Sequence, residues 1–140
     1  MSSKAEDYVR WILQLDGAYN VPIAELGAKT AVTTSIAAFS TALEKRFEDG
    51  ASPDEAREFV GHVRGKWVKS DALNPVLAEL AIMDGLGEEG LVDDVPIAEL
   101  TETQNLLTYA IVNDLGLAGP AVEEFIRESM ALLNTLEDEN

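Results

Sequence analysis

The sequence predicts an all-α protein, a single compact bundle of about six helices built from two tandem three-helix units. A hexapeptide, VPIAEL, occurs at residues 21–26 and again at 95–100, so the two copies lie 74 positions apart. Apolar residues recur at the three- and four-residue spacing of amphipathic helices, and no segment alternates convincingly over the length of a strand. Pro, Gly, Ser and Asn residues mark the places where one helix should end and the next begin.

The repeated hexapeptide indicates an internal duplication, because identical six-residue segments are very rare by chance in 140 residues. The flanks agree: residues 8–17 (YVRWILQLDG) align with residues 76–85 (VLAELAIMDG), and both end in an apolar residue, Asp and Gly. We expect one domain over residues 1–140, with unit one at about 5–70 and unit two at about 74–137. The connection is too short for a flexible linker, so the units should share one core.

The first unit is expected to hold three helices. Apolar periodicity predicts the first at about residues 5–15, with Gly17 as a left-handed stop. Asn20 is predicted to cap the segment that carries the first hexapeptide. The second helix, at about 28–48, is the longest, and the third begins with a capping box over residues 52–55 (SPDE).

The second unit repeats this plan. Helices are expected at about residues 75–83, 102–115 and 120–136, the first of them capped by Asn74. Residues 101–104 (TETQ) form a second capping-box pattern, which predicts that the hexapeptide is a turn leading into the main helix.

Small side chains follow one face of the longest predicted helix, at a spacing that lets another helix approach closely. Two interpretations are open: the row faces other helices of the same fold, or it is a seam for self-association. The row consists of Ala28, Ala31, Ser35, Ala38 and Ala42.

Composition excludes several classes of protein. The chain has no cysteine, which excludes disulfides, thiolate metal sites and a cysteine nucleophile. The opening residues (MSSKAED) lack the apolar core of a signal peptide, and no apolar run approaches the roughly 18–20 residues of a membrane span. We therefore expect a cytoplasmic protein without membrane contact.

The net charge of −16 is unevenly distributed. Residues 1–70 carry nine Lys/Arg against ten Asp/Glu, a net charge of −1, whereas residues 71–140 carry Arg127 against sixteen acids, a net charge of −15. Phosphates would be repelled by the second half, so direct nucleic-acid binding is excluded there. Adaptation to a salty cytoplasm would acidify both halves, so the asymmetry favours a specific partner.

Residues for catalysis are scarce. His62 is the single histidine, and nothing in the sequence indicates a nucleophile or an orienting group beside it. The loop at 84–94 carries five acids, but not in the order of a calcium-binding loop, so we predict a solvated loop and no metal. We lean against an enzyme and expect no cofactor.

A basic cluster lies on and just after the third predicted helix, with His62 and Trp67 between its members. Its charges suit three roles: complementing the helix dipole, contacting phosphate, or meeting the acidic second unit. The cluster consists of Arg57, Arg64, Lys66 and Lys69.

Three functional classes follow. We prefer a non-enzymatic protein–protein interaction or assembly module, whose acidic second half engages a basic partner or which binds a second copy of itself. The alternatives are an acidic decoy that imitates DNA and inhibits a nucleic-acid-handling protein, and a small-molecule-binding or enzymatic bundle with a pocket between the units. The acids predicted to meet the partner are Glu88, Glu89, Asp93, Asp94, Glu102, Glu123 and Glu124.

Overall fold

Helices account for all the regular structure that the computed structural model describes, which is residues 3–15, 18 and 23–138, with only the backbone at 23 and 24. Within these residues there are six helices of nine residues or more and one single-turn helix, and the predicted all-α class is confirmed. The helices are α1 (Lys4–Ile12), α2 (Ile23–Leu26), α3 (Ala28–Arg46), α4 (Pro53–Val63), α5 (Pro75–Gly85), α6 (Ile97–Asp114) and α7 (Pro120–Asp138).

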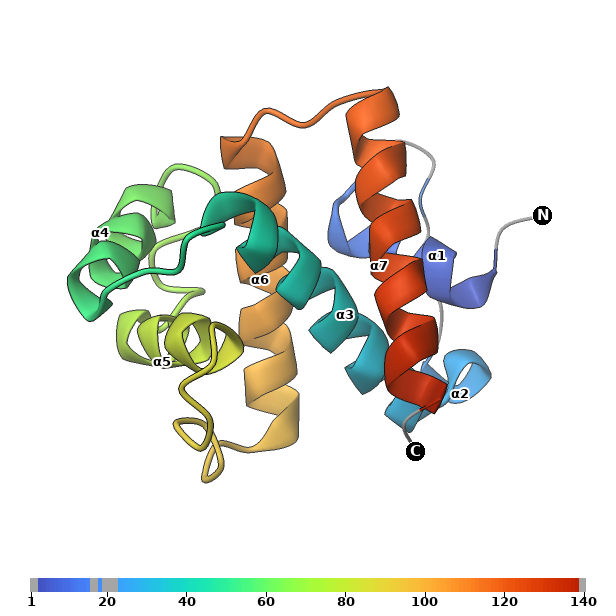
Figure 1. Cartoon of the computed structure of the whole chain (residues 1–140), viewed down its shortest axis with the longest axis horizontal. Coiled ribbons are helices and arrows are strands. Elements are labelled where there is room, and N and C mark those ends of the chain that lie inside the picture. The colour runs from blue at the N-terminus through green and yellow to red at the C-terminus, as the bar shows by residue number, and fades with distance from the viewer. Residues whose placement is uncertain (1–2, 16–17, 19–22, 139–140) are drawn as a thin grey trace.

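The helices form a central pair flanked on two sides (Figure 1). α3 and α6 pack against each other in the middle, α4 and α5 pair on one side, and α1 and α7 cover the other side. Some contacts join helices that are consecutive in the sequence, such as α4 and α5, and others join distant helices, such as α3 and α7. α4 packs mainly on α5, and α7 packs on α3 and α1. The division into two tandem three-helix units stays a prediction.

Two predicted helix starts are confirmed in detail. Ser52 and Glu55 form a reciprocal capping box, in which each backbone N–H donates to the other's side chain at 3.0 and 3.2 Å. The carboxamide oxygen of Asn74 accepts from the backbone N–H groups of Val76 and Leu77. Proline follows each cap, where its missing N–H costs no helical hydrogen bond.

The second predicted capping box is wrong. α6 begins at Ile97, directly after Pro96, so Thr101 lies inside the helix and its N–H needs no cap. The first copy of the hexapeptide behaves differently, because Gly27 stands where the second copy has Thr101. Gly27 has a φ of +93°, which separates α2 from α3. One residue thus decides whether the helix breaks or continues.

The predicted helix bounds hold at most ends, with small differences. α1 ends at Ile12, three residues before the predicted end, and Gln14 adopts a left-handed φ of 56°. α5 continues two residues beyond the predicted end, to Gly85. The predicted stop at Gly17, the cap at Asn20, the first two residues of the first hexapeptide (21–22) and the last two residues of the chain lie outside the described residues.

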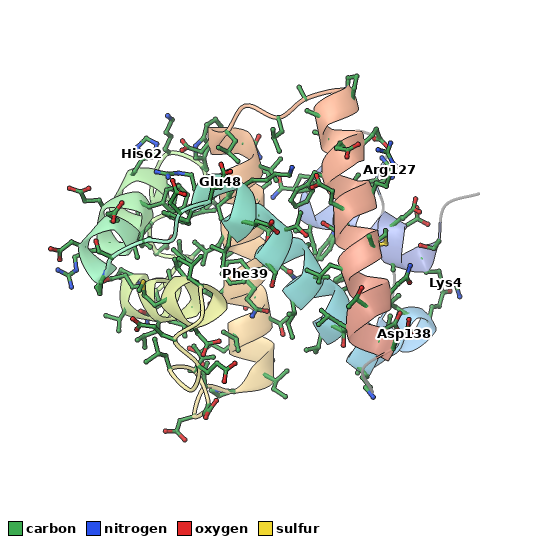
Figure 2. All side chains as sticks on the ribbon, viewed as in Figure 1. Lys4, Phe39, Glu48, His62, Arg127 and Asp138 are labelled. Carbon is green, nitrogen blue, oxygen red and sulfur yellow. The ribbon has the colours of Figure 1, made fainter. Side chains whose placement is uncertain are left out.

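The main apolar core draws on α1 and on α3 to α7. Phe39 of α3 lies near the centre of the molecule, whereas His62 lies at its outer edge (Figure 2). α5 approaches α3 so closely that a Cβ added to Gly85 would lie 2.5 Å from Cδ1 of Leu43. Because Leu43 is itself fully buried, glycine is the residue that permits this crossing.

The small-residue row of α3 is covered within the chain. Ala31, Ser35, Ala38 and Ala42 are buried, and α6 and α7 make their most extensive contacts with this helix. Ala28, at the start of α3, is exposed. The row therefore faces other helices of the same fold, and Ala28 is the member of the row left accessible to another molecule.

Candidate functional site

An open groove of about 870 Å³ lies between α1, the start of α3 and the first three turns of α6. Its walls are mainly apolar, and each helix contributes to them. They include Trp11 and Ile12 of α1, Ala31 and Val32 of α3, and Leu106 and Tyr109 of α6. The volume lies in the range of known ligand and peptide sites, which are concave and mostly apolar with few polar groups.

The rim of this groove exposes large apolar side chains. Ile97 is 65% exposed and Trp11 is 38% exposed, although the ring of Trp11 also stacks on Tyr8 with centroids 5.9 Å apart. Alanine at positions 28 and 98 keeps the groove open, because a short side chain on a facing helix cannot fill the space. Exposed apolar residues grouped around a hollow are typical of a binding surface.

A small polar network borders the groove. The phenol of Tyr8 shares a hydrogen bond of 3.0 Å with the hydroxyl of Ser35, and the amide of Asn105 donates to the same phenol at 3.3 Å. The buried Oδ1 of Asn105 has no hydrogen-bond partner among the described residues. Exchanging the amide oxygen and nitrogen would leave the nitrogen unpaired instead. In either orientation one buried amide atom is left without a hydrogen-bond partner among the described residues.

Carboxylates gather at the end of the groove where α6 begins. Glu102 lines the groove, Glu99 lies one turn earlier on α6, and Asp93 and Asp94 precede the helix; all four are exposed. On α3, the basic residue Lys29 directly follows Ala28, which lines the groove. This end of the groove is therefore predominantly acidic.

The seven predicted partner-binding acids do not form one surface. Glu88, Glu89, Asp93 and Asp94 lie in the loop between α5 and α6, at the opposite end of the molecule from the start of α7 (Figure 1). Glu102 lies on α6 in the groove, and the remaining two lie on the first turns of α7.

Both acids on α7 are already paired within the chain. The guanidinium of Arg10 donates two hydrogen bonds to Glu123, at 2.7 and 2.8 Å, and Arg127 pairs with Glu124. The hydrogen bond from Arg10 lowers the pKa of Glu123 and stabilises its charged form. These two carboxylates join α7 to α1 and to itself, so they are poorly placed to meet a partner.

The basic cluster contacts the acidic second half inside the molecule. One oxygen of Asp114, at the end of α6, accepts from the indole N–H of Trp67 at 3.0 Å and lies 2.7 Å from Nε2 of His62. The ammonium of Lys66 is 3.8 Å from the same oxygen. Arg64 instead donates to the carbonyls of Ser70 and Leu73 and holds the loop after α4. Of the three roles considered for the cluster, contact with the second half is the one this geometry displays.

The pKa of Asp114 is lowered by this arrangement. Burial alone would raise the pKa, but the hydrogen bonds from Trp67 and His62, with the charges of His62 and Lys66, outweigh it. The carboxylate is therefore held in its charged form. His62 has no nucleophile among these partners, so the cluster joins α4 to α6 and offers no catalytic arrangement that the geometry supports.

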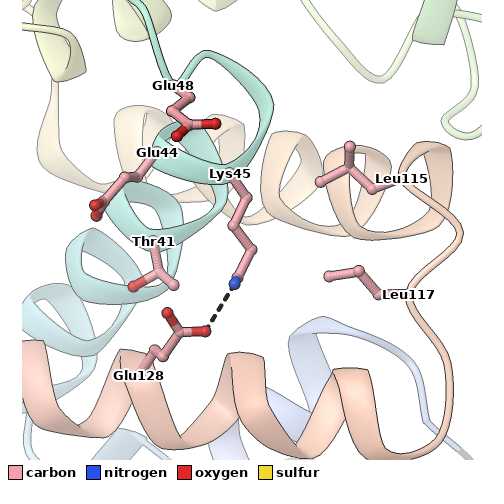
Figure 3. Close-up of a pocket in the computed structure, with 7 residues that line it drawn as sticks. All are labelled: Thr41, Glu44, Lys45, Glu48, Leu115, Leu117 and Glu128. Atoms are coloured by element: carbon pink, nitrogen blue, oxygen red, sulfur yellow. Dashed lines mark ion pairs between the residues drawn. The ribbon is translucent and has the colours of Figure 1, made fainter.

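A second hollow, of about 440 Å³, lies between α3, α7 and the residues that follow α6 (Figure 3). Lys45 reaches across it to Glu128, with 2.7 Å between the ammonium and the carboxylate. Glu44 of α3 and Glu48, two residues beyond the end of α3, also line it. The ammonium of Lys45 already neutralises the carboxylate of Glu128. Over the described ranges, no three His, Asp or Glu side chains are placed to share a metal ion.

Several groove residues were not singled out by the sequence. Trp11, Ile97 and Tyr109 are among them, because helical spacing does not distinguish a buried stripe from an exposed one. Leu100, in the same hexapeptide as Ile97, packs on the core. Trp11 stacks on Tyr8, yet Tyr8 is buried and Trp11 is exposed, a difference that the sequence alone does not display.

Comparisons with known proteins give no relative: the chain matches no family model, no curated protein and no solved structure. In the part of the chain that the structure describes, none of the helices has both the length and the apolar composition needed to cross a bilayer.

Proposed function

We propose that this protein is a non-enzymatic protein–protein interaction module, and that its groove between α1, α3 and α6 receives a basic partner. The observation that carries the proposal is the apolar groove of about 870 Å³ with Trp11 and Ile97 exposed at its rim. Exposed aromatic and aliphatic side chains around a concavity are the usual anchors of a protein interface. The acidic end of the groove supports a partner of positive charge.

The decoy alternative has less support. A mimic of DNA needs its carboxylates spread over one continuous surface, and the predicted acids lie at two ends of the molecule. Glu123 and Glu124 also pair with arginines of the same chain. We therefore place the interaction at the groove, where Glu102 lies, and treat the acids of the α5–α6 loop as a contribution to charge steering.

The internal duplication also belongs to this proposal. The two hexapeptides precede or begin the two central helices, and these helices pack on each other beside the groove. At the spacing of 74 residues, Ala28 corresponds to Glu102 and Ala98 to Ala24, so a duplication would account for the two central helices and not for the two alanines at the groove. A related chain that holds a single unit would support this origin.

The proposal is tested by a pair of variants that add the same charge at different exposed sites. Ala98→Glu places a carboxylate in the groove, whereas Val76→Glu places one on α5, at a side chain that is 63% exposed and outside the groove. Tagged wild-type protein and both variants are used to capture proteins from the native cell extract. We expect a partner on the wild type and on Val76→Glu that Ala98→Glu does not retain. Identical captured proteins on all three would contradict the proposal.

A second candidate is a small-molecule site in the same groove, favoured by its volume of about 870 Å³ and its mainly apolar walls. A ligand would then raise the thermal unfolding midpoint of the wild type and of Val76→Glu, and not that of Ala98→Glu. A metabolite panel that leaves all midpoints unchanged would remove this candidate.

A further inference from the structure

Two faces of α6 have different surroundings. One face is buried in the core and includes Leu107 and Ile111. The other lines the groove with a stripe of two neighbouring residues in each turn, repeated every four residues, so that the stripe is inclined to the helix axis. The stripe consists of Ile97, Ala98, Thr101, Glu102, Asn105, Leu106 and Tyr109. This four-residue spacing is how one helix presents a face to another helix.

The stripe sets the length of what can lie along it. From Ile97 to Tyr109 is thirteen residues, which at a rise of 1.5 Å per residue is about 18 Å, or roughly three turns of a partner helix. The open groove admits an element of that length from the side. Ala28 and Ala98 leave room for its backbone to approach, while Trp11 and Ile97 stand at the rim to contact its apolar side chains.

The charges around the stripe decide between a second copy and a different partner. Glu99, Glu102, Asp93 and Asp94 lie at or just before the start of α6. A second copy of this chain would bring 26 acids against 10 basic residues, so like charges would meet. A partner with Lys or Arg at this end would instead be attracted. The charge therefore favours a different, basic partner.

We infer that the occupant of the groove is an amphipathic helix of about three turns, apolar along one face and carrying Lys or Arg at the end that lies near the start of α6. This inference rests on the proposed function and names the partner's chemistry. Recognition of this kind uses apolar anchors at i, i+3 or i+4, i+7 and i+11.

Three synthetic 14-residue peptides test the inference. The first is a Leu/Lys peptide with Leu along one helical face, the second has the same composition in scrambled order, and the third keeps the Leu pattern with Glu in place of Lys. Binding of each labelled peptide to the full chain is followed by fluorescence anisotropy. We expect the patterned Leu/Lys peptide to bind at least about tenfold more tightly than either of the others, because only it combines the apolar face with the positive charge.

The two matched variants locate the binding. Ala98→Glu should weaken the binding of the patterned Leu/Lys peptide by about tenfold or more, although it adds a negative charge. The reason is that the bound peptide would bury the new carboxylate against apolar side chains. Val76→Glu should stay within about twofold of the wild type, since it adds the same charge outside the groove. Circular dichroism confirms that both variants fold. If Ala98→Glu does not fold, Ile97→Glu repeats the test at a side chain that is 65% exposed.

The outcomes separate this inference from the proposed function. Equal affinity of patterned and scrambled peptides would overturn the helical occupant, because attraction to the acidic surface alone would explain both. Tight binding of the Leu/Glu peptide would overturn the basic partner. If Ala98→Glu loses the captured native partner yet leaves the Leu/Lys peptide unaffected, the groove remains the interaction site and the helix inference falls. If Ala98→Glu changes neither the capture of the native partner nor the binding of the Leu/Lys peptide, the proposed function and the helix inference are both wrong.

Discussion

Asp114 is the residue through which the end of α6 holds the segment after α4. Its carboxylate is 16% exposed and accepts hydrogen bonds from the indole of Trp67 and the imidazole of His62. Asp114→Ala should lower the free energy of unfolding at pH 7 by about 1–3 kcal/mol, because the half-buried indole N–H loses its acceptor. Urea denaturation measures the change. Asp71→Ala, at an exposed carboxylate in the same region, is the control and should stay within about 0.5 kcal/mol.

The same carboxylate predicts a pH dependence. The folded state lowers the pKa of Asp114, so its contribution is fully present above the ordinary carboxyl pKa of about 4 and is lost as the pH falls through the lower folded value. The stability difference between the wild type and Asp114→Ala should therefore shrink when unfolding is measured at about pH 3 or below. An equal difference at both pH values would show that the pKa shift does not contribute to stability.

Two helical glycines should respond in opposite directions to the same substitution. Gly85→Ala places a methyl group against the buried Leu43 and should destabilise the protein by about 1–3 kcal/mol through overpacking. Gly61 lies within α4 with no atom close to its added Cβ, so Gly61→Ala should stabilise by about 0.5–1 kcal/mol. A comparison of the thermal unfolding midpoints of the two variants separates the effect of packing from the effect of helix propensity. A stabilising Gly85→Ala would mean that α5 can move away from α3.

At the scale of helices, the two capping-box patterns should differ in their effect on stability. Ser52→Ala removes the side chain that accepts from Glu55 at the start of α4 and should cost about 1 kcal/mol. Thr101→Ala removes the same kind of residue from the interior of α6, where alanine is the better helix former, and should not destabilise by more than about 0.5 kcal/mol. Equal losses would indicate that Thr101 caps a helix after all.

The comparison of these two patterns shows what local sequence can predict. Ser52 and Asn74 stand before a proline that no helix interior tolerates, so the position of the cap is unambiguous. Thr101 follows four residues that are themselves able to form a helix, and Pro96 already supplies an earlier start. Local patterns therefore predicted the helices well, with an error where two starts competed.

The candidate site was harder to predict, because it depends on how helices distant in the sequence are arranged. Leu107 and Tyr109 lie two residues apart on α6, yet Leu107 is fully buried and Tyr109 lines the groove. Nothing in the local sequence shows that α7 would cover one side of α3 and leave the start of that helix open. The acidic end of the groove was the part that charge patterning did indicate, through Glu102 and its neighbours.

For the whole molecule, the net charge of −16 has to be accommodated by a bundle whose halves share one core. Ion pairs such as Arg10 with Glu123 and Lys45 with Glu128 join the second half to the first. These pairs are partly exposed and so contribute little each. The surplus acids repel one another through solvent, and the repulsion acts at longer range than the pairs do. Salt should therefore screen more repulsion than attraction.

This balance predicts that salt stabilises the protein. Between about 0.01 M and 0.1 M NaCl the Debye length falls from about 30 Å to about 10 Å, and we expect the thermal unfolding midpoint to rise by about 3 °C or more. Glu88→Lys with Glu89→Lys, in the exposed α5–α6 loop, changes the net charge from −16 to −12. The double variant should unfold at a higher temperature in low salt and gain less from added salt. A midpoint that falls with salt would show that the ion pairs joining α7 to α1 and α3 outweigh the repulsion, and the acidity would then have to be explained by those contacts instead of by a partner.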